Sequence, residues 1–157
     1  MNLNGNERGA RWQGTDTHPA SYVDGSVFNA VSKNSGLTFI VGDNNFNPSI
    51  WVDSNEFPLP IEGNNFGSAV DLAIVNNTEY IVGLVGDTPA LAKPAIWINR
   101  ELSFLPFPDG FDNPEVTAVS FDENGNYYVV GFAQDENNRN NSFIWKNGIF
   151  SFLSNTR

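Results

Sequence analysis

The sequence predicts an all-β protein built from repeats of a four-stranded antiparallel sheet. The 157 residues include 13 Phe, four Trp and four Tyr, and aromatic side chains suit the surface of a pleated sheet. There are also 23 Asn, 14 Gly and nine Pro, which are the residues that tight turns favour. Two sets of residues recur with a period in the forties, namely Trp12, Trp51, Trp97 and Trp145, and the Val-Gly glycines Gly42, Gly83 and Gly131.

Each repeat unit is expected to contain four short strands. The first strand carries alternating small or apolar residues, at 27–31, 69–74 and 116–121. The second strand ends at the Val-Gly pair, and a variable loop follows at 43–47, 84–93 and 132–141. The third strand contains the Trp, at 49–52, 95–98 and 142–145, and the last strand reads FPLP, LSFLP or IFSFL. Asn and Gly between the strands tolerate the positive φ that tight hairpins require.

Four-stranded sheets that repeat every ~40–50 residues are typical of β-propeller blades. We therefore expect one domain with about three and a half blades: a partial blade at residues 1–26 and blades at 27–68, 69–115 and 116–157. The first unit is partial because Trp12 corresponds to a third strand that has no first or second strand before it. The alternative is a β-trefoil or a three-fold β-prism, since three repeats with one Trp each also fit those folds.

The recurring residues have expected structural roles. Because the Trp residues recur at one position of the unit, they are expected to pack between neighbouring blades rather than to serve as platforms for sugars. The glycine of each Val-Gly pair is expected to let the chain leave the second strand without a clash of a Cβ atom.

The units resemble the bacterial propeller-type repeats called HAF repeats. The resemblance lies in the pattern Y-[IV]-V-G, variable loop, A-x-W-x-N-G, which is clearest in YIVG…KPAIWINRELSFLP and YVVG…NSFIWKNGIFSFL, and it covers about residues 27–153. The first unit has a shorter loop and Asp53-Ser54 in place of Asn-Gly, and no unit contains His-Ala-Phe. The resemblance implies a propeller and is compatible with a secreted or periplasmic location. It implies no particular function, because such repeats occur in proteins with different roles.

Three and a half blades would leave both end blades without a neighbour. Closed propellers have about four to eight blades, and large apolar patches rarely stay exposed on soluble monomers. We therefore expect a homodimer that closes one ring of about six or seven blades.

Composition argues against several classes of function. The 18 acidic and eight basic residues give a formal net charge of −10, which disfavours nucleic-acid binding. Cys is absent, which rules out disulfides and Cys nucleophiles, and no cofactor or metal site is expected. No stretch approaches the ~20 apolar residues of a membrane span. The single histidine, His18, precedes a proline and is expected to be an ordinary loop residue rather than a catalytic one.

The variable loops are the expected places of contact, because binding residues concentrate on loops carried by a rigid scaffold. The candidate ligand-binding residues are Asp43, Asn44, Asp87, Asp135, Glu136, Asn138 and Arg139. The segment DENGN at 122–126 superficially resembles a calcium loop, but it lacks the downstream Gly and Glu. A hairpin turn is the preferred interpretation.

The function expected from these features is that of a non-catalytic binding module that presents polar loops to a protein or carbohydrate ligand. One alternative is an enzyme that acts on a polysaccharide in the central cleft of a closed ring. The other is a purely structural unit that assembles with copies of itself. The enzyme ranks last, because the sequence has one His, no Cys and no recognisable nucleophile motif.

Overall fold

The computed structural model describes residues 8–11, 21–24 and 26–153, so Trp12 and His18 lie outside the described residues. The chain forms a two-stranded hairpin followed by three four-stranded antiparallel sheets. The hairpin pairs β1 (Arg8–Arg11) with β2 (Ser21–Asp24). The prediction of an all-β protein made of four-stranded antiparallel sheets is confirmed. No helix in the described segments is long and apolar enough to cross a membrane.

Within each sheet the strands lie side by side in the order in which they occur along the chain. Sheet 1 contains β3 (Ser26–Asn34), β4 (Leu37–Asn44), β5 (Asn47–Val52) and β6 (Asn55–Pro58). Sheet 2 contains β7 (Phe66–Val75), β8 (Thr78–Gly86), β9 (Lys93–Ile98) and β10 (Glu101–Phe104). Sheet 3 contains β11 (Phe111–Phe121), β12 (Tyr127–Asp135), β13 (Asn140–Lys146) and β14 (Ile149–Phe152).

Several hairpin turns place Asn or Gly at positions of positive φ. The turn from β13 to β14 has φ of 49° at Asn147 and 80° at Gly148, and positive φ at both central residues is the mark of a type I′ turn, whose twist matches that of the flanking strands. The corresponding turn of sheet 2 has φ of 49° at Asn99 and 70° at Arg100. Arg100 adopts this conformation while its guanidinium pairs with the Glu79 carboxylate at 2.8 Å.

The glycine of each Val-Gly pair does not end its strand, contrary to the sequence-based expectation. Strands β4, β8 and β12 all continue beyond it. Each glycine instead lies beside an irregularity in the first strand of its sheet, where the pairing register shifts. A Cβ atom at Gly83 would run into the carbonyl oxygen of Ser68 across the ladder, and one at Gly42 would meet that of Val27. The glycines are therefore required for close backbone approach.

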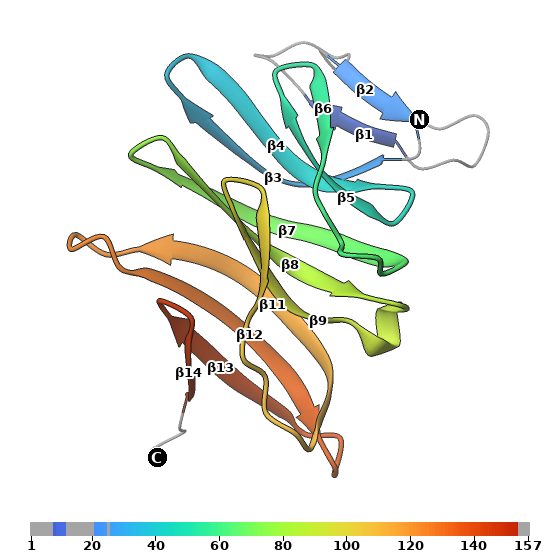
Figure 1. Ribbon diagram of the computed structural model, residues 1–157, viewed down its shortest axis with the longest axis vertical. Helices are drawn as coiled ribbons and strands as arrows, with labels where there is room; N and C mark the ends of the chain where they lie inside the picture. The colour runs from blue at the N-terminus through green and yellow to red at the C-terminus, as the bar shows by residue number, and fades with distance from the viewer. Residues whose placement is uncertain (1–7, 12–20, 25, 154–157) are drawn as a thin grey trace.

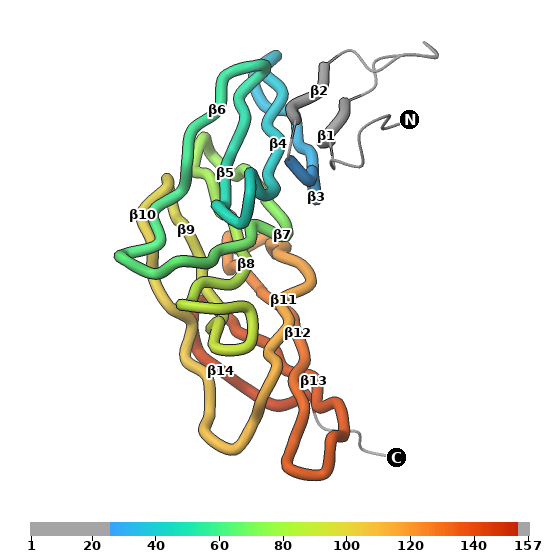
Figure 2. The backbone as a smooth tube through the Cα atoms, turned by 90° about the vertical axis from the view of Figure 1, so that its right-hand side faces the viewer, coloured from blue at the N-terminus to red at the C-terminus, as the bar shows by residue number. Residues whose placement is uncertain are grey.

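The three sheets stack face to face along the long axis of the molecule (Figures 1 and 2). One hydrophobic core lies between sheets 1 and 2 and contains Trp97, and a second lies between sheets 2 and 3 and contains Trp145. Both indoles are fully buried. Trp97 Nε1 donates to the Pro60 carbonyl oxygen at 2.8 Å, and Trp145 Nε1 donates to that of Pro106 at 2.6 Å. Each Trp thus joins its own sheet to the segment that arrives from the preceding sheet.

Candidate functional site

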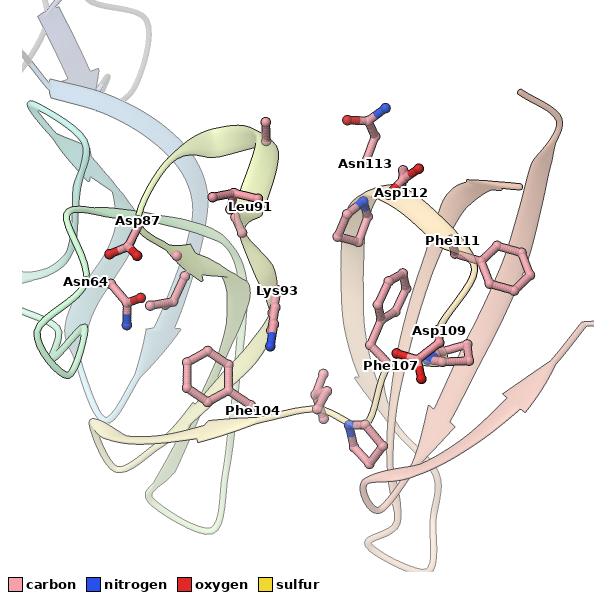
Figure 3. A pocket seen from close by; sticks show the side chains of 18 of the residues that line it. Asn64, Asp87, Leu91, Lys93, Phe104, Phe107, Asp109, Phe111, Asp112 and Asn113 are labelled. Atoms are coloured by element: carbon pink, nitrogen blue, oxygen red, sulfur yellow. The ribbon is translucent and has the colours of Figure 1, made fainter. Parts of the chain in front are cut away.

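Two adjoining cavities open at the junction of sheets 2 and 3, with volumes of about 950 Å³ and 660 Å³. They share Ala90, Asn113 and Pro114 in their lining. The two adjoining cavities together are called here the 2/3 groove. Figure 3 shows its larger part, with Asp87, Leu91, Lys93 and Phe104 on the sheet 2 side and Phe107, Asp109, Phe111, Asp112 and Asn113 on the sheet 3 side.

The first wall of the 2/3 groove is the loop between β8 and β9. This loop contains a 3₁₀ turn, η1 (Pro89–Leu91), in which the Leu91 N–H donates to the Thr88 carbonyl at 3.0 Å. The loop folds back over its own start, because a Cβ atom at Gly86 would lie 2.6 Å from the Cα of Ala92. Glycine at this position therefore allows a compact wall that leaves the Leu91 side chain exposed.

The second wall is an irregularity in β11. The pairing register with β12 shifts between Asp112 and Glu115, so Asn113 and Pro114 stand out of the regular ladder. Asn113 has φ of 50° and its side-chain amide donates to the Gln134 side-chain oxygen at 3.1 Å. Because proline has no N–H, Pro114 cannot donate a backbone hydrogen bond to sheet 2.

The floor is the segment between β10 and β11, anchored where the Leu105 N–H donates to the Pro94 carbonyl at 2.9 Å. Phe107 and Phe111 are held by edge contacts to the buried Phe143 ring, both with centroids 5.8 Å apart. Phe104, by contrast, is 43% exposed. Phe104 is therefore the more exposed ring of the lining, while Phe107 and Phe111 are partly buried against the core.

The larger cavity has an acidic lining with a single cation. Its carboxylates belong to Glu62, Asp87, Asp109 and Asp112, its cation to Lys93, and its side-chain amides to Asn64 and Asn113. Carboxylates accept hydrogen bonds and amides both donate and accept them. Beside an exposed ring, such groups suit a neutral ligand that carries several hydroxyls.

Of the ligand-binding residues predicted from the sequence, Asp87 lies in the wall of the 2/3 groove. Asp43 lies at the junction of sheets 1 and 2, where its carboxylate accepts from Ser68 Oγ and from the Ala69 N–H, both at 3.0 Å. Burial raises the pKa of Asp43 above its usual value, against the opposing effect of these two hydrogen bonds. Asn44 donates to both carboxylate oxygens of Glu56, at 3.0 and 3.1 Å.

The remaining predicted residues lie together in the loop between β12 and β13, outside the lining of the 2/3 groove. Asp135 closes this loop on itself: its carboxylate accepts from the N–H of Asn137 at 2.9 Å, from that of Arg139 at 3.0 Å, and from the Arg139 guanidinium. These contacts, with the Arg139 N–H foremost, lower the pKa of Asp135 to about 2. Glu136 and Asn138 are exposed in the same loop.

The turn after β11 is held by its own hydrogen bonds. Asp122 accepts from the side-chain amide of Asn126 at 2.7 Å, from the N–H groups of Asn124 and Asn126, and from the Tyr128 hydroxyl at 2.9 Å. The Asn126 amide is the main cause that lowers the pKa of Asp122 to about 2. No group of three His, Cys, Asp or Glu side chains suited to a metal ion occurs among the described residues.

Reasoning from sequence missed most of the 2/3 groove, including Phe104, Asp109, Asn113 and Pro114. A usable signal was present in FLPFPDGFDNP at 104–114. Residues 105–110, between β10 and β11, include two prolines and one Phe, whereas residues 59–65, between β6 and β7, include one proline and no aromatic residue. Proline in a strand usually marks an edge or a bulge, so the segment could have been assigned to a rim.

The fold, but no family, is identified by comparison with known proteins. No family model and no curated protein matches the sequence. The structure is similar to that of a fucose lectin from Kordia zhangzhouensis in complex with methyl-fucoside, with a TM-score of 0.61 and 12% sequence identity. The superposition covers 82% of this chain and 99% of the lectin chain. At this identity the similarity concerns the fold.

Proposed function

We propose that this protein is a non-catalytic carbohydrate-binding module whose site is the 2/3 groove. The observation that carries the proposal is the exposed Phe104 ring beside carboxylates and amides in an open groove between two rigid sheets. A sugar can stack its C–H face on an aromatic ring, and its hydroxyls can donate hydrogen bonds to nearby acceptors. Ligand sites generally combine apolar surface with a few well-placed polar groups. The similarity of the fold to a fucose lectin supports a saccharide rather than a protein as the ligand.

The ligand is a neutral saccharide. The larger cavity holds four carboxylates against the single cation of Lys93, and the whole chain carries a net charge of −10. Uronic acids, sialylated sugars and sulfated sugars are therefore repelled, since like charges close together disfavour binding.

We also propose that sheets 1 to 3 are the blades of a β-propeller of the HAF-repeat type and that the hairpin β1–β2 belongs to a partial blade at residues 1–26. Two features support this: the order of the strands within each sheet, and the stacking of successive sheets through a buried Trp. The similarity of the fold to a lectin is compatible with the assignment.

A glycan array of neutral and acidic saccharides, followed by isothermal titration calorimetry with the best ligand, tests the proposed function. Wild-type protein is expected to bind neutral sugars, and Phe104→Ala to weaken binding about tenfold, equivalent to ~1.4 kcal/mol. Phe46→Ala is the matched control, because Phe46 is also an exposed Phe but lies in the turn between β4 and β5, outside the groove lining. An array without binders, or equal losses for both variants, would refute the proposal.

A further inference from the structure

The smaller cavity of the 2/3 groove differs from the larger one in its lining. Its volume is about 660 Å³, and it shares Ala90, Asn113 and Pro114 with the larger cavity. Seven of its eleven lining residues are apolar, and among the described residues that line it Glu115 alone is charged. A group rich in hydroxyls therefore finds fewer partners here than beside the carboxylates of the larger cavity.

A comparison of the repeat units explains why the smaller cavity is apolar. The residue directly after the Val-Gly glycine is Asp43 in sheet 1 and Leu84 in sheet 2. At the junction of sheets 1 and 2, the Asp43 carboxylate accepts from Ser68 Oγ and from the Ala69 N–H. At the junction of sheets 2 and 3, the Leu84 side chain has no polar atom for such a bridge and lines the smaller cavity instead. A leucine in place of a carboxylate thus gives this junction an apolar recess.

Three apolar side chains of this lining belong to neither hydrophobic core of the described residues. They are Phe66, Val70 and Phe132, and each is only partly buried. Apolar side chains that gather in a recess without joining a core are typical of a ligand site. Each of the three has apolar surface that a ligand group can cover.

Several polar side chains of the smaller cavity already have partners within the protein. Ser68 Oγ donates to the Asp43 carboxylate at 3.0 Å, and the Asn113 side-chain amide donates to Gln134 Oε1 at 3.1 Å. The larger cavity instead presents carboxylates such as that of Asp87 (Figure 3). A ligand group that enters the smaller cavity therefore gains mainly from the burial of apolar surface.

We propose that the smaller cavity binds an apolar group attached to the saccharide, so that the ligand is a neutral glycoside with an apolar aglycone. This inference rests on the proposed function, because the sugar itself occupies the larger cavity beside Phe104. The two cavities adjoin, so one ligand with a sugar at one end and an apolar group at the other fills both. Leu84 and Phe132 contact the apolar group.

Isothermal titration calorimetry with paired glycosides tests the inference. The probes are the methyl and phenyl glycosides of glucose, galactose, mannose and fucose, together with maltose, lactose and mannobiose, in which a second sugar replaces the apolar group. The phenyl glycoside of the preferred sugar is expected to bind about tenfold more tightly than its methyl glycoside, because the phenyl ring is buried against apolar side chains.

Variants of the two cavities assign this advantage to its place in the groove. Phe132→Ser should remove the advantage and leave the affinity for the methyl glycoside unchanged, since Phe132 lines only the smaller cavity. Val70→Ser, which also changes a residue outside both cores, should reduce the advantage roughly threefold. Phe104→Ala should weaken both glycosides alike. Phe57→Ser is the matched control, because Phe57 is 40% exposed in β6 and lies outside both linings. Circular dichroism shows whether each variant is folded.

Three outcomes overturn the inference and leave the proposed function standing. The first is equal affinity of the wild type for methyl and phenyl glycosides that both bind less tightly to Phe104→Ala. The second is an advantage of the phenyl glycoside that persists in both Phe132→Ser and Val70→Ser. The third is a disaccharide that binds more tightly than the phenyl glycoside and is weakened by Phe132→Ser, because the smaller cavity then takes a second sugar. A wild-type protein that binds neither glycosides nor disaccharides refutes the proposed function and the inference with it.

Discussion

The junction between sheets 1 and 2 and the junction between sheets 2 and 3 have equivalent hydrophobic cores but differ at their rims. Between sheets 1 and 2 the Gly67 N–H donates to the Phe46 carbonyl at 3.0 Å, and Gly67 lies so close to Pro48 that a Cβ atom would be 2.6 Å from its Cδ. Between sheets 2 and 3 the place of Gly67 is taken by Pro114, at the register shift in β11. Proline has no N–H to donate, and its ring takes up space that glycine, without a side chain, leaves open. That junction therefore stays open.

Loop length adds to the difference. The chain passes from β4 to β5 through the two residues Asn45 and Phe46, both with positive φ. From β8 to β9 it passes through residues 87–92, which include η1. A repeat can thus keep its stacking residues constant while one irregularity and one longer loop turn a closed junction into a groove. Stability and binding should accordingly respond to different substitutions.

The largest expected effect comes from breaking the core that the closed junction depends on. Trp97→Ala removes a fully buried indole and its bond to the Pro60 carbonyl, and is expected to lower the free energy of unfolding by about 3–5 kcal/mol. Urea denaturation followed by circular dichroism measures it. Trp97→Phe, which keeps a ring but loses the donor, should cost clearly less. Equal costs for the two variants would show that the hydrogen bond, and not packing, dominates.

A moderate effect is expected from adding one methyl group at the closed rim. Gly67→Ala places a Cβ atom against Pro48 and within 2.9 Å of Ile61, and overpacking of this kind costs about 1–3 kcal/mol. The same denaturation experiment measures the loss, and affinity for the saccharide should not change. The next residue, Ser68, lies in the lining of the 2/3 groove. A change in affinity would therefore reveal that the two junctions are coupled through β7.

The comparison of the junctions is sharpened by giving sheet 2 the short turn of sheet 1. Replacing residues 87–92 with Asn-Phe, the sequence between β4 and β5, removes the first wall of the 2/3 groove. Affinity is expected to fall at least about tenfold, or ~1.4 kcal/mol, by calorimetry. The unfolding midpoint should fall only slightly, because residues 87–91 are all exposed and Ala92 is the one buried residue that is replaced. The loop between β12 and β13 offers a control: Asn138→Ser lies outside the groove lining and should bind as wild type does.

The sequence alone predicts the repeated four-stranded sheets but not the 2/3 groove, for a physical reason. Trp97 and Gly83 recur at a fixed spacing because every sheet needs the same packing residue and the same close backbone approach. The groove depends on differences between units, and Phe104 occupies the same strand position as Pro58 and Phe152. Whether such a residue faces a cavity depends on the neighbouring sheet. No spacing within a single unit carries that information.

Polarity alone does not predict which loop lines the 2/3 groove. The loop at 135–140 is the most polar of the three variable loops, but Asp135 and Arg139 satisfy each other within it. The loop at 87–92 contains mainly small and apolar residues, yet it forms the wall of the 2/3 groove. What a loop can offer a ligand depends on which of its polar groups its own backbone has already engaged.

The smallest expected effect comes from the carboxylate that bridges the closed junction. Because burial raises the folded-state pKa of Asp43 above 3.8, the native state binds this proton more tightly than the unfolded chain does. Its contribution to stability is thus greatest below the unfolded pKa and falls as pH rises through the folded pKa.

Asp43→Asn keeps an acceptor for the Ala69 N–H and a donor for Ser68 Oγ without a buried charge. It should be slightly more stable than wild type at pH 7, by less than ~1 kcal/mol, and the gain should vanish near pH 3. Urea denaturation across this pH range measures the difference, with Asp87→Asn, in the wall of the open groove, as the control. A variant that is less stable than wild type at pH 7 would mean that the charge itself strengthens the bonds to Ser68 and Ala69 by more than its burial costs.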